Sequence, residues 1–483
     1  MVPDAEQPAP DTAPAPLPHR RHQHRAVALG VALVVVLGAA GGTGVWLARS
    51  SDRSFTASTI PIPTAAEPST NLPACYQSDD VWLMSLCGGD MDMPKALAVM
   101  GNGIVVVGGA TLSQNGSFAD APAAYAGFST PFTAQITRPT DMSLTFGGLA
   151  MNDAAPMADG GIVAVGHEYV LISPDDSQKS SVSLNAKVIR YDQDLNVVWQ
   201  ATYITSNRMA TFTAVAVGLD GSIVAVGTNT ATSHGLDQAM MAKYSATGDQ
   251  LWAHDLGEIG KDFPGTPNSL AIDSAGNIYI VATTSKPSEY TASGTVAGAA
   301  IAMANPSGDI VWTKTYGGTG KDVFNDAVTT PDGIMVVGAS YSKDGDFAQP
   351  EGSAAIMAVI NQTGDIVTSC FYSDVISATF NSVAMTARGD FALAGQTSRS
   401  GFSDDALITL VQPPTGLGGV CHATWSLVYD GDSDDEFTHI AMSPDGEIVV
   451  TGQTASGLQS TLPTSMGGYD VVVAKLTLRG ILA

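Results

Sequence analysis

Short runs of apolar residues, each preceded by a tight-turn signal, recur along most of the chain. Clear copies are residues 219–227 and 444–452, in which an Asp-Gly pair precedes a run rich in Ile and Val that closes on Gly. Asp-Gly suits the positive φ angles of a hairpin turn, and such runs suit a strand buried on both faces. The runs close at residues 108, 166, 227, 282, 338, 395 and 452, so successive copies are 55 to 61 residues apart. This regular spacing predicts a repeat fold.

Each copy contains four strand-like segments. In the third copy these are residues 212–217, 223–226, 238–244 and 250–254. Four strands per copy and seven copies predict an all-β chain that forms a seven-bladed β-propeller of four-stranded blades. Five of the six tryptophans recur in the fourth strand, and we expect them to pack between neighbouring blades: Trp82, Trp199, Trp252, Trp312 and Trp425.

The two ends of the repeat region complement each other. The last copy ends with a third strand at residues 470–478 and has no fourth strand after it. Residues 81–86 form an unassigned strand before the first copy. A strand at 81–86 that completes the last blade would leave no open sheet edge at the seam, which predicts a closed ring.

The segments before the propeller differ sharply in composition. Residues 1–25 are rich in Pro and basic residues, and predict a disordered cytoplasmic tail. Residues 26–48 carry no charge and are long enough for a transmembrane signal-anchor helix, with arginines on the side expected to stay inside. Residues 49–73 predict a Pro/Ser/Thr-rich linker, and residues 74–483 the ectodomain. We therefore expect a single-pass plasma-membrane protein with an extracellular C-terminal domain. A cleaved signal peptide is the alternative, because residues 38–40 are small.

Cysteine count and charge agree with an extracellular domain. The four cysteines, an even number, predict disulfides with three possible pairings. Cys75–Cys87 together with Cys370–Cys421 would close the shortest loops. The net charge of −25 disfavours nucleic acids and anionic lipids and favours cations or basic partners.

The repeats resemble a known family. Residues 452–464 and 467–476 are similar to the bacterial SBBP-type propeller repeat, and residues 308–318 are similar to the segment that links such repeats. The resemblance spans about residues 81–483 and implies a secreted or surface-exposed propeller without recognised catalytic residues. Residues 244–252 resemble, more distantly, the repeat of quinoprotein propellers. The chain lacks the adjacent cysteines of the quinone-dependent alcohol dehydrogenases, so no cofactor is predicted.

Candidate chemistry is sparse along the chain. It contains no G-x-S-x-G, H-E-x-x-H or P-loop motif. Asp430, Asp432 and Asp434 alternate as at the start of a calcium loop, but Asp435 stands where an EF-hand needs Gly and Ala441 where it needs Glu. The five ectodomain histidines are scattered through different blades. His254 and His439 are expected to pack in strands, and His167 and His234 to lie in loops; the fifth is His422. No catalytic, cofactor-binding or metal-binding residue is assigned from the sequence.

The loop lengths point to one functional face. Loops between second and third strands, such as 109–131 and 339–353, are long and share a face with the blade connections, which carry acids: Asp90, Asp92, Asp262, Asp322, Asp374 and 430–436. We expect a monomeric, non-enzymatic scaffold that binds an extracellular protein or glycan on this face. The alternative is a carbohydrate-active or quinone-linked enzyme, which would require titratable groups to converge at the central mouth. The first strands, which line the channel, are mostly small and apolar, and this favours the scaffold.

Overall fold

The computed structural model describes most of the repeat region. The described residues are 76–77, 82–121, 129–172, 181–203, 209–231, 236–287, 295–348, 353–372, 377–398, 403–429, 433–455 and 468–477. Within these ranges no helix is long and apolar enough to cross a membrane. The predicted anchor at 26–48, the tail and the linker lie outside the described residues, and so does Cys75.

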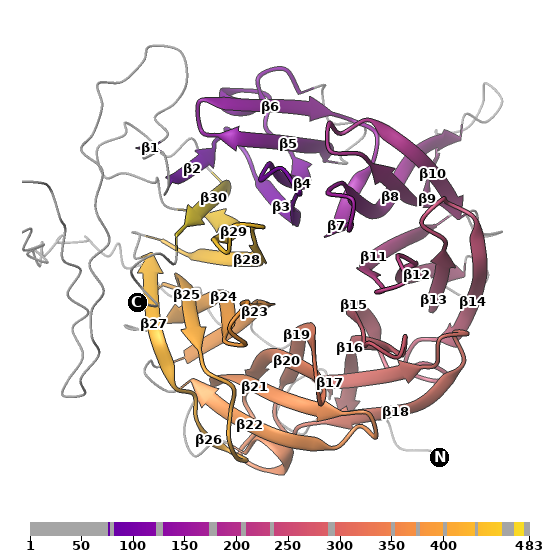
Figure 1. Cartoon of the computed structure of the whole chain (residues 1–483), viewed down its shortest axis with the longest axis vertical. Helices are drawn as coiled ribbons and strands as arrows, with labels where there is room; N and C mark the ends of the chain where they lie inside the picture. Colours follow the sequence, from indigo (N-terminus) through magenta and orange to yellow (C-terminus); the bar gives the residue numbers. More distant parts are fainter. Residues whose placement is uncertain are drawn as a thin grey trace, which may run out of the picture.

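Seven antiparallel sheets stand around a central axis, as the repeats predict (Figure 1). Blade 1 contains β3 (Asp92–Val99), β4 (Val105–Thr111), β5 (Thr130–Arg138) and β6 (Asp141–Phe146). Blade 2 contains β7 (Ala150–Pro156), β8 (Ile162–Ile172), β9 (Ser181–Tyr191) and β10 (Val197–Tyr203). Blade 3 contains β11 (Ala210–Val217), β12 (Ile223–Ala231), β13 (Leu236–Tyr244) and β14 (Gln250–Glu258). Blade 4 contains β15 (Thr266–Ile272), β16 (Ile278–Pro287), β17 (Thr295–Ala304) and β18 (Ile310–Tyr316).

Of the remaining three blades, blades 5 and 7 carry an additional short strand at the outer edge. Blade 5 contains β19 (Asp322–Thr330), β20 (Gly333–Ser340), β21 (Ala354–Asn361) and β22 (Ile366–Tyr372), with β26 (Gly419–Val420) added in parallel. Blade 6 contains β23 (Ser377–Met385), β24 (Phe391–Ser398), β25 (Asp405–Val411) and β27 (Ala423–Tyr429). Blade 7 contains β28 (Asp435–Met442), β29 (Ile448–Thr454), β30 (Asp470–Leu476), β2 (Trp82–Leu86) and β1 (Tyr76–Gln77). Two short 3-10 helices, η1 (Gly116–Phe118) and η2 (Gly345–Phe347), follow second strands.

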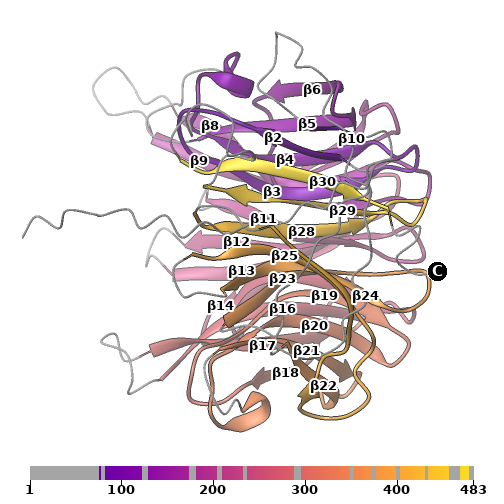
Figure 2. The ribbon, with the colours of Figure 1, turned by 90° about the vertical axis from the view of Figure 1, so that its left-hand side faces the viewer.

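The ring closes at the seam that the sequence predicts. Strand β2 pairs antiparallel with β30, from Trp82 opposite Lys475 to Leu86 opposite Val471. The side view shows β2 and β30 stacked together although they come from opposite ends of the chain (Figure 2). Because β2, from before the first blade, completes the last blade, strand β30 has a partner on both sides.

A β-bulge interrupts the innermost strand of all seven blades at one shared position. At four of the bulges the extra residue is an Asn whose side-chain amide donates to a backbone carbonyl of the next blade. The four donor and acceptor pairs are Asn152 to Phe212, Asn268 to Phe324, Asn325 to Phe380 and Asn381 to Phe437, at 2.8–3.0 Å. In blade 3 the Thr213 hydroxyl donates in the same way to Pro267 O at 3.0 Å. Since a bulge re-aims the local side chains, it turns these polar groups toward the neighbouring blade.

The hydrophobic core lies between blades. Each of its seven clusters combines residues from two adjacent sheets. The predicted packing role of the tryptophans is confirmed: Trp199 packs over the turn at Gly248 of blade 3, and Trp312 over the turn at Gly364 of blade 5. Each indole N–H also donates to a carbonyl of that turn, Ala246 O at 3.0 Å and Gln362 O at 2.9 Å.

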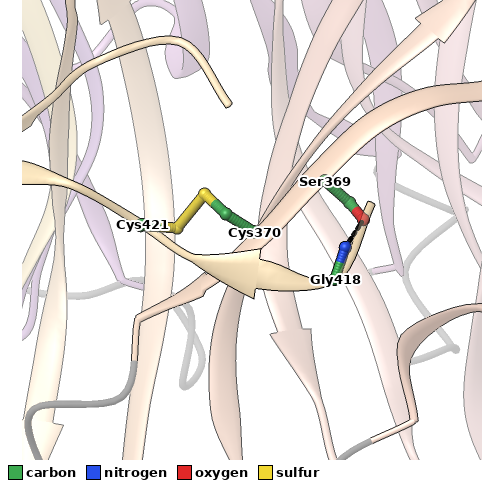
Figure 3. Close-up of a disulfide and its surroundings, with 4 residues drawn as sticks. All are labelled: Ser369, Cys370, Gly418 and Cys421. Atoms are coloured by element: carbon green, nitrogen blue, oxygen red, sulfur yellow. Dashed lines mark hydrogen bonds between the residues drawn. A yellow bond between two sulfur atoms is a disulfide. The ribbon is translucent and has the colours of Figure 1, made fainter. Parts of the chain in front are cut away.

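One disulfide joins Cys370 in β22 to Cys421 in an insertion of blade 6 (Figure 3). The insertion also binds blade 5 through Gly418 N, which donates to Ser369 Oγ at 3.0 Å. The Cys370–Cys421 pairing was one of the possibilities from the sequence. The matching Cys75–Cys87 bond stays a prediction, because Cys75 lies outside the described residues. The Cys87 thiol lies 2.8 Å from Ser85 Oγ.

Candidate functional site

A polar cavity of about 180 Å³ opens between blades 6 and 7. It lies on the face that carries the second-to-third strand loops and the blade connections, where binding is expected from the sequence. Its lining comes from five separate stretches of chain: Gln396, Asp404, Asp434, Asp435, Glu436, Gln453 and Tyr469. We call this cavity the acidic pocket, because four of its seven lining residues are carboxylic acids.

Amide side chains fix the orientation of the Glu436 and Asp404 carboxylates. Gln453 Nε2 donates to Glu436 Oε1 at 2.6 Å, and Asn381 Nδ2 donates to Glu436 Oε2 at 3.3 Å. Gln396 Nε2 donates to Asp404 Oδ2 at 3.0 Å. Both glutamines directly follow a glycine within the second strand of their blade, so they come from the repeat framework and not from a loop.

The electrostatic environment of the acidic pocket disfavours ionised acids. Burial raises the pKa of Asp404, and the nearby Asp434 raises it further. Burial also raises the pKa of Glu436; hydrogen bonds from Gln453 and Asn381 oppose this, and Asp404 adds to it. Burial and then the surrounding carboxylates raise the pKa of the Tyr469 hydroxyl. A bound cation would relieve this crowding of negative charge.

Asp435 has a structural role that other blades share. Its carboxylate accepts a short hydrogen bond from the Thr454 hydroxyl at the end of the second strand. Asp322 in blade 5 accepts in the same way from Ser340 at 2.6 Å, and Asp92 in blade 1 from Thr111 at 2.5 Å. All three aspartates are buried, so these acids of the blade connections hold the blade ends together. Burial raises the pKa of Asp92 to about 6.

Other acids expected at the connections do not gather in the pocket. Asp90 and Asp262 are exposed, and Asp262 accepts from the backbone N–H of Glu258 at 3.3 Å. Asp374 lies outside the described residues. Of the three aspartates in the calcium hypothesis, only Asp434 is described, because Asp430 and Asp432 fall in the gap at 430–432. Among the described side chains no group of three His, Cys, Asp or Glu could hold a metal ion, so calcium binding stays a hypothesis.

The central channel carries more titratable groups than the small, apolar first strands suggest. The residue after the bulge is polar in five blades: Asp153, Ser269, Asp326, Ser382 and His439. Asp153 accepts from the backbone N–H of Ala154 and of Val215 in the next blade, at 2.7 and 2.8 Å. Burial raises the pKa of Asp153 to about 7, with a contribution from Asp326. From the sequence, Ser269, Asp326, Ser382 and His439 are expected in the strands that line the channel, but those strands are taken as mostly small and apolar. Asp153 was overlooked, because a bulge shifts the alternation of inward and outward side chains by one residue.

None of the described histidines forms a hydrogen bond with a carboxylate. His254 Nε2 lies 3.0 Å from Ser307 O, and its ring stacks on Trp252, as expected for a packed strand residue. Burial lowers the pKa of His167 and of His439 to about 4, so both are neutral near pH 7. The prediction that His167 lies in a loop is wrong: it lies in strand β8, because this strand continues to Ile172. Its Nδ1 lies 2.9 Å from Thr211 Oγ1 of the next blade. His422 is exposed, and His234 lies outside the described part of the chain.

The fold and the loop-rich face define a seven-bladed β-propeller with an acidic pocket. Residues 258–286 match the SBBP family, described as a beta-propeller repeat. This match confirms the resemblance to the SBBP-type repeat that was drawn from the sequence, at residues 258–286. A search of the curated proteins found no match to the chain.

Solved structures with a similar arrangement include several enzymes. An α-L-arabinofuranosidase from Fusarium graminearum shares 8% identity over 84% of this chain and 99% of its own, with a TM-score of 0.41. A gluconolactonase from Xanthomonas campestris shares 11% identity over 83% of this chain and 90% of its own, with a TM-score of 0.35. A polysaccharide lyase shares 12% identity over 80% of this chain and 90% of its own, with a TM-score of 0.43. At these identities and TM-scores the likenesses carry no argument about the function of this chain.

Proposed function

We propose that this protein is a non-enzymatic binding scaffold on the outer face of a bacterial plasma membrane. The segment at 26–48 anchors it, the N-terminus stays in the cytoplasm, and the propeller stands outside as a monomer. The ligand is an extracellular protein or glycan that presents a cationic group, an amine or a guanidinium, to the acidic pocket. Cell fractionation checks the anchor, because a protein released in soluble form would contradict it.

The acidic pocket carries this proposal. Burial and Asp434 disfavour ionisation of Asp404, and Asp404 adds to the effect of burial on Glu436. Amides of Gln396, Gln453 and Asn381 nevertheless hold both carboxylates in place. An organic cation with several N–H donors fits such a rigid set of acceptors, because charge-assisted hydrogen bonds are the stronger ones. Tyr469 adds an aromatic surface that suits a cation. The overall charge of −25 would speed the approach of a basic ligand.

The test combines an array with matched variants. The purified full-length chain is applied to arrays of glycans and peptides, and we expect it to retain amino sugars or lysine- and arginine-containing peptides, less strongly at higher salt. The variants Asp404→Asn and Glu436→Gln should each lower the affinity for the best ligand at least tenfold. Asp445→Asn removes the same charge from an exposed turn of blade 7 on the opposite face and should leave affinity unchanged. Equal losses in all three variants would contradict a specific site.

A carbohydrate-active enzyme is the second candidate, and the same pocket favours it. A carboxylic acid whose pKa is raised by burial and by a neighbouring carboxylate is suited to general acid catalysis. Glu436 and Asp404 have these properties. Mass spectrometry of the retained glycans separates the two functions. Cleaved products that disappear in Glu436→Gln would support the enzyme, whereas intact ligand supports the scaffold.

A further inference from the structure

The fourth strand of each blade has one position that faces the next blade. To locate it, we start from the second-strand residue opposite the start of the bulge, which is Gly109 in blade 1 and Gly166 in blade 2. The position pairs with the third-strand residue three places after the partner of that residue. In five blades this position holds tryptophan: Trp82, Trp199, Trp252, Trp312 and Trp425. In blades 2, 3 and 4 the indole packs over a left-handed glycine in the next blade's turn: Gly248, Gly308 and Gly364. We call this position and the space beside it the indole slot.

Blade 5 lacks the tryptophan but covers its slot in another way. Thr368 stands at the position. The insertion from blade 6 lies alongside, where β26 adds to the edge of β22 and the Cys370–Cys421 disulfide fastens it. Gly416 O accepts from Ser369 N at 2.8 Å. An added strand and a covalent bond therefore take the place of the indole.

Blade 1 has neither substitute among the described residues. Ser143 stands at the position, opposite Gln135. In the turn of blade 2, Leu195 occupies the place of the glycine and is the one described non-glycine residue with positive φ, at 59°. Met151 stands where Phe212, Phe324, Phe380 and Phe437 begin the bulge in other blades. The three changes go together, because without an indole the turn has room for a leucine side chain.

These changes leave an open cavity of about 160 Å³ between blades 1 and 2. Its lining includes Ser143, Thr145, Met151, Tyr191 and Leu195. Among the described residues, the buried core at this seam has ten members and no fully buried aromatic, with Tyr191 partly buried beside it, whereas each other seam buries 13 to 15 residues with at least one aromatic. A cavity of roughly 150 Å³ accommodates a benzene-sized ring.

The neighbouring edge strand is open as well. Strand β6 is the last strand of its sheet and pairs with β5 alone. The chain itself covers two other outer edges with short strands, β26 on β22 and β1 on β2. An extended segment that added to β6 would place a side chain beside Ser143 on the face that lines the cavity, because cross-strand neighbours share a face.

We propose that the indole slot of blade 1 is a docking site for a tryptophan carried on an extended segment of a partner protein. The partner strand adds to the edge of β6 and its indole fills the space between Ser143 and Leu195. The other seams identify the occupant, since the same framework holds an indole at this position in five blades.

The experiment measures peptide binding to the full-length chain by isothermal titration. The probe is the acetylated heptapeptide Thr-Lys-Thr-Trp-Thr-Lys-Thr amide, and its control has leucine in place of tryptophan. We expect the tryptophan peptide to bind at least tenfold more tightly than the leucine peptide, with N-acetyl-tryptophanamide competing for the site. Equal binding of the two peptides, or no binding of the tryptophan peptide, would overturn the proposal.

A double variant that fills the indole slot of blade 1 with a tryptophan of the chain itself provides a second test. Ser143→Trp together with Leu195→Gly restores the pattern of blades 2, 3 and 4, so it should abolish peptide binding and raise the Tm by several degrees. The control Thr202→Trp adds a tryptophan to the exposed face of edge strand β10 and should leave both quantities unchanged. Retained peptide binding in the filled variant would place the peptide elsewhere. A concentration-dependent dimer that the filled variant disperses would put a second copy of the chain in the slot and also overturn the proposal.

Discussion

The carboxylate of Asp326 in blade 5 accepts a 2.7 Å hydrogen bond from the hydroxyl of Ser382 in blade 6. The same carboxylate accepts from Ser269 of blade 4 at 2.7 Å and from two backbone N–H groups, of Ala327 and Val383, at 2.8 and 3.0 Å. One side chain beside the axis thus connects three consecutive blades. Its acceptor capacity is used within the protein, which argues for a structural role and not for substrate binding.

The first prediction concerns this connection. Asp326→Ala leaves two hydroxyls and one inter-blade N–H without their acceptor, so we expect a loss of about 2–4 kcal/mol in the free energy of unfolding. Urea denaturation measures the loss. Asp445→Ala, at an exposed turn, should change the unfolding midpoint little. A midpoint for Asp326→Ala that matches this control would show that the blades do not depend on the connection.

The second prediction follows from the raised pKa of Asp153. Its pKa in the folded protein is about 7, against an ordinary value of 3.8, because burial disfavours the ionised form. The folded state therefore holds more protons than the unfolded state between these values, so the free energy of unfolding falls as pH rises through this window. The slope from one group is at most about 1.4 kcal/mol per pH unit. Asp92, with a pKa of about 6, acts in the same direction.

A repeat-matched variant isolates the contribution of Asp153. Serine occupies the corresponding position in blade 6, where Ser382 Oγ accepts from Ile440 N at 3.3 Å. Asp153→Ser should therefore keep the bond to Val215 N, remove the charge, and flatten the slope of stability between pH 4 and 7. Thermal unfolding across this range checks the expectation, and identical slopes in the two proteins would contradict it.

Most of the architecture could be predicted from the sequence because it repeats. The seven strand runs recur every 55 to 61 residues, and the surplus strand at 81–86 matches the strand missing after 470–478. The tryptophans predict packing between blades, because they recur at one position of the fourth strand. The missing tryptophan of blade 1 was equally visible in the sequence. It was overlooked because it leaves a gap in the pattern and adds no motif.

The acidic pocket was only partly predictable. Asp434 and Glu436 lie in a conspicuous acidic run, but Asp404 and Tyr469 are isolated residues that only the ring brings beside them. A usable signal existed in the repeated Gly-Gln-Thr at residues 395–397 and 452–454, which supplies both pocket glutamines. Of the two channel carboxylates, Asp326 was placed in a channel-lining strand from the sequence, whereas Asp153 was missed because bulges break the two-residue alternation from which side-chain facing is inferred.

The third prediction concerns the seam. Deletion of residues 74–88 removes β2, which pairs with β30 along its whole length of five residues. It also removes Trp82, Met84 and Leu86 from the core between blades 7 and 1. We expect the shortened chain to aggregate through the exposed edge of β30. Deletion of residues 1–73 is the control and should leave a monomer in light scattering. A monomeric, equally heat-stable 74–88 deletion would refute this role for β2.

The last prediction tests the acidic pocket through protons. Without ligand, burial holds the pKa values of Asp404 and Glu436 above their ordinary range, and repulsion from Asp434 on Asp404 and from Asp404 on Glu436 adds to this. A bound cation favours the ionised carboxylates, so their pKa values should fall and protons should be released on binding in weakly acidic solution. Affinity for an amine-bearing ligand should accordingly rise as pH increases from about 4 to 7.

Titration calorimetry in two buffers of different ionisation enthalpy measures the released protons directly. In Asp404→Asn the release should shrink, since one titrating group is gone and the repulsion on Glu436 is lower. In the Asp445→Asn control it should stay the same. Proton uptake on binding, or release that is unchanged in Asp404→Asn, would show that the cation binds elsewhere.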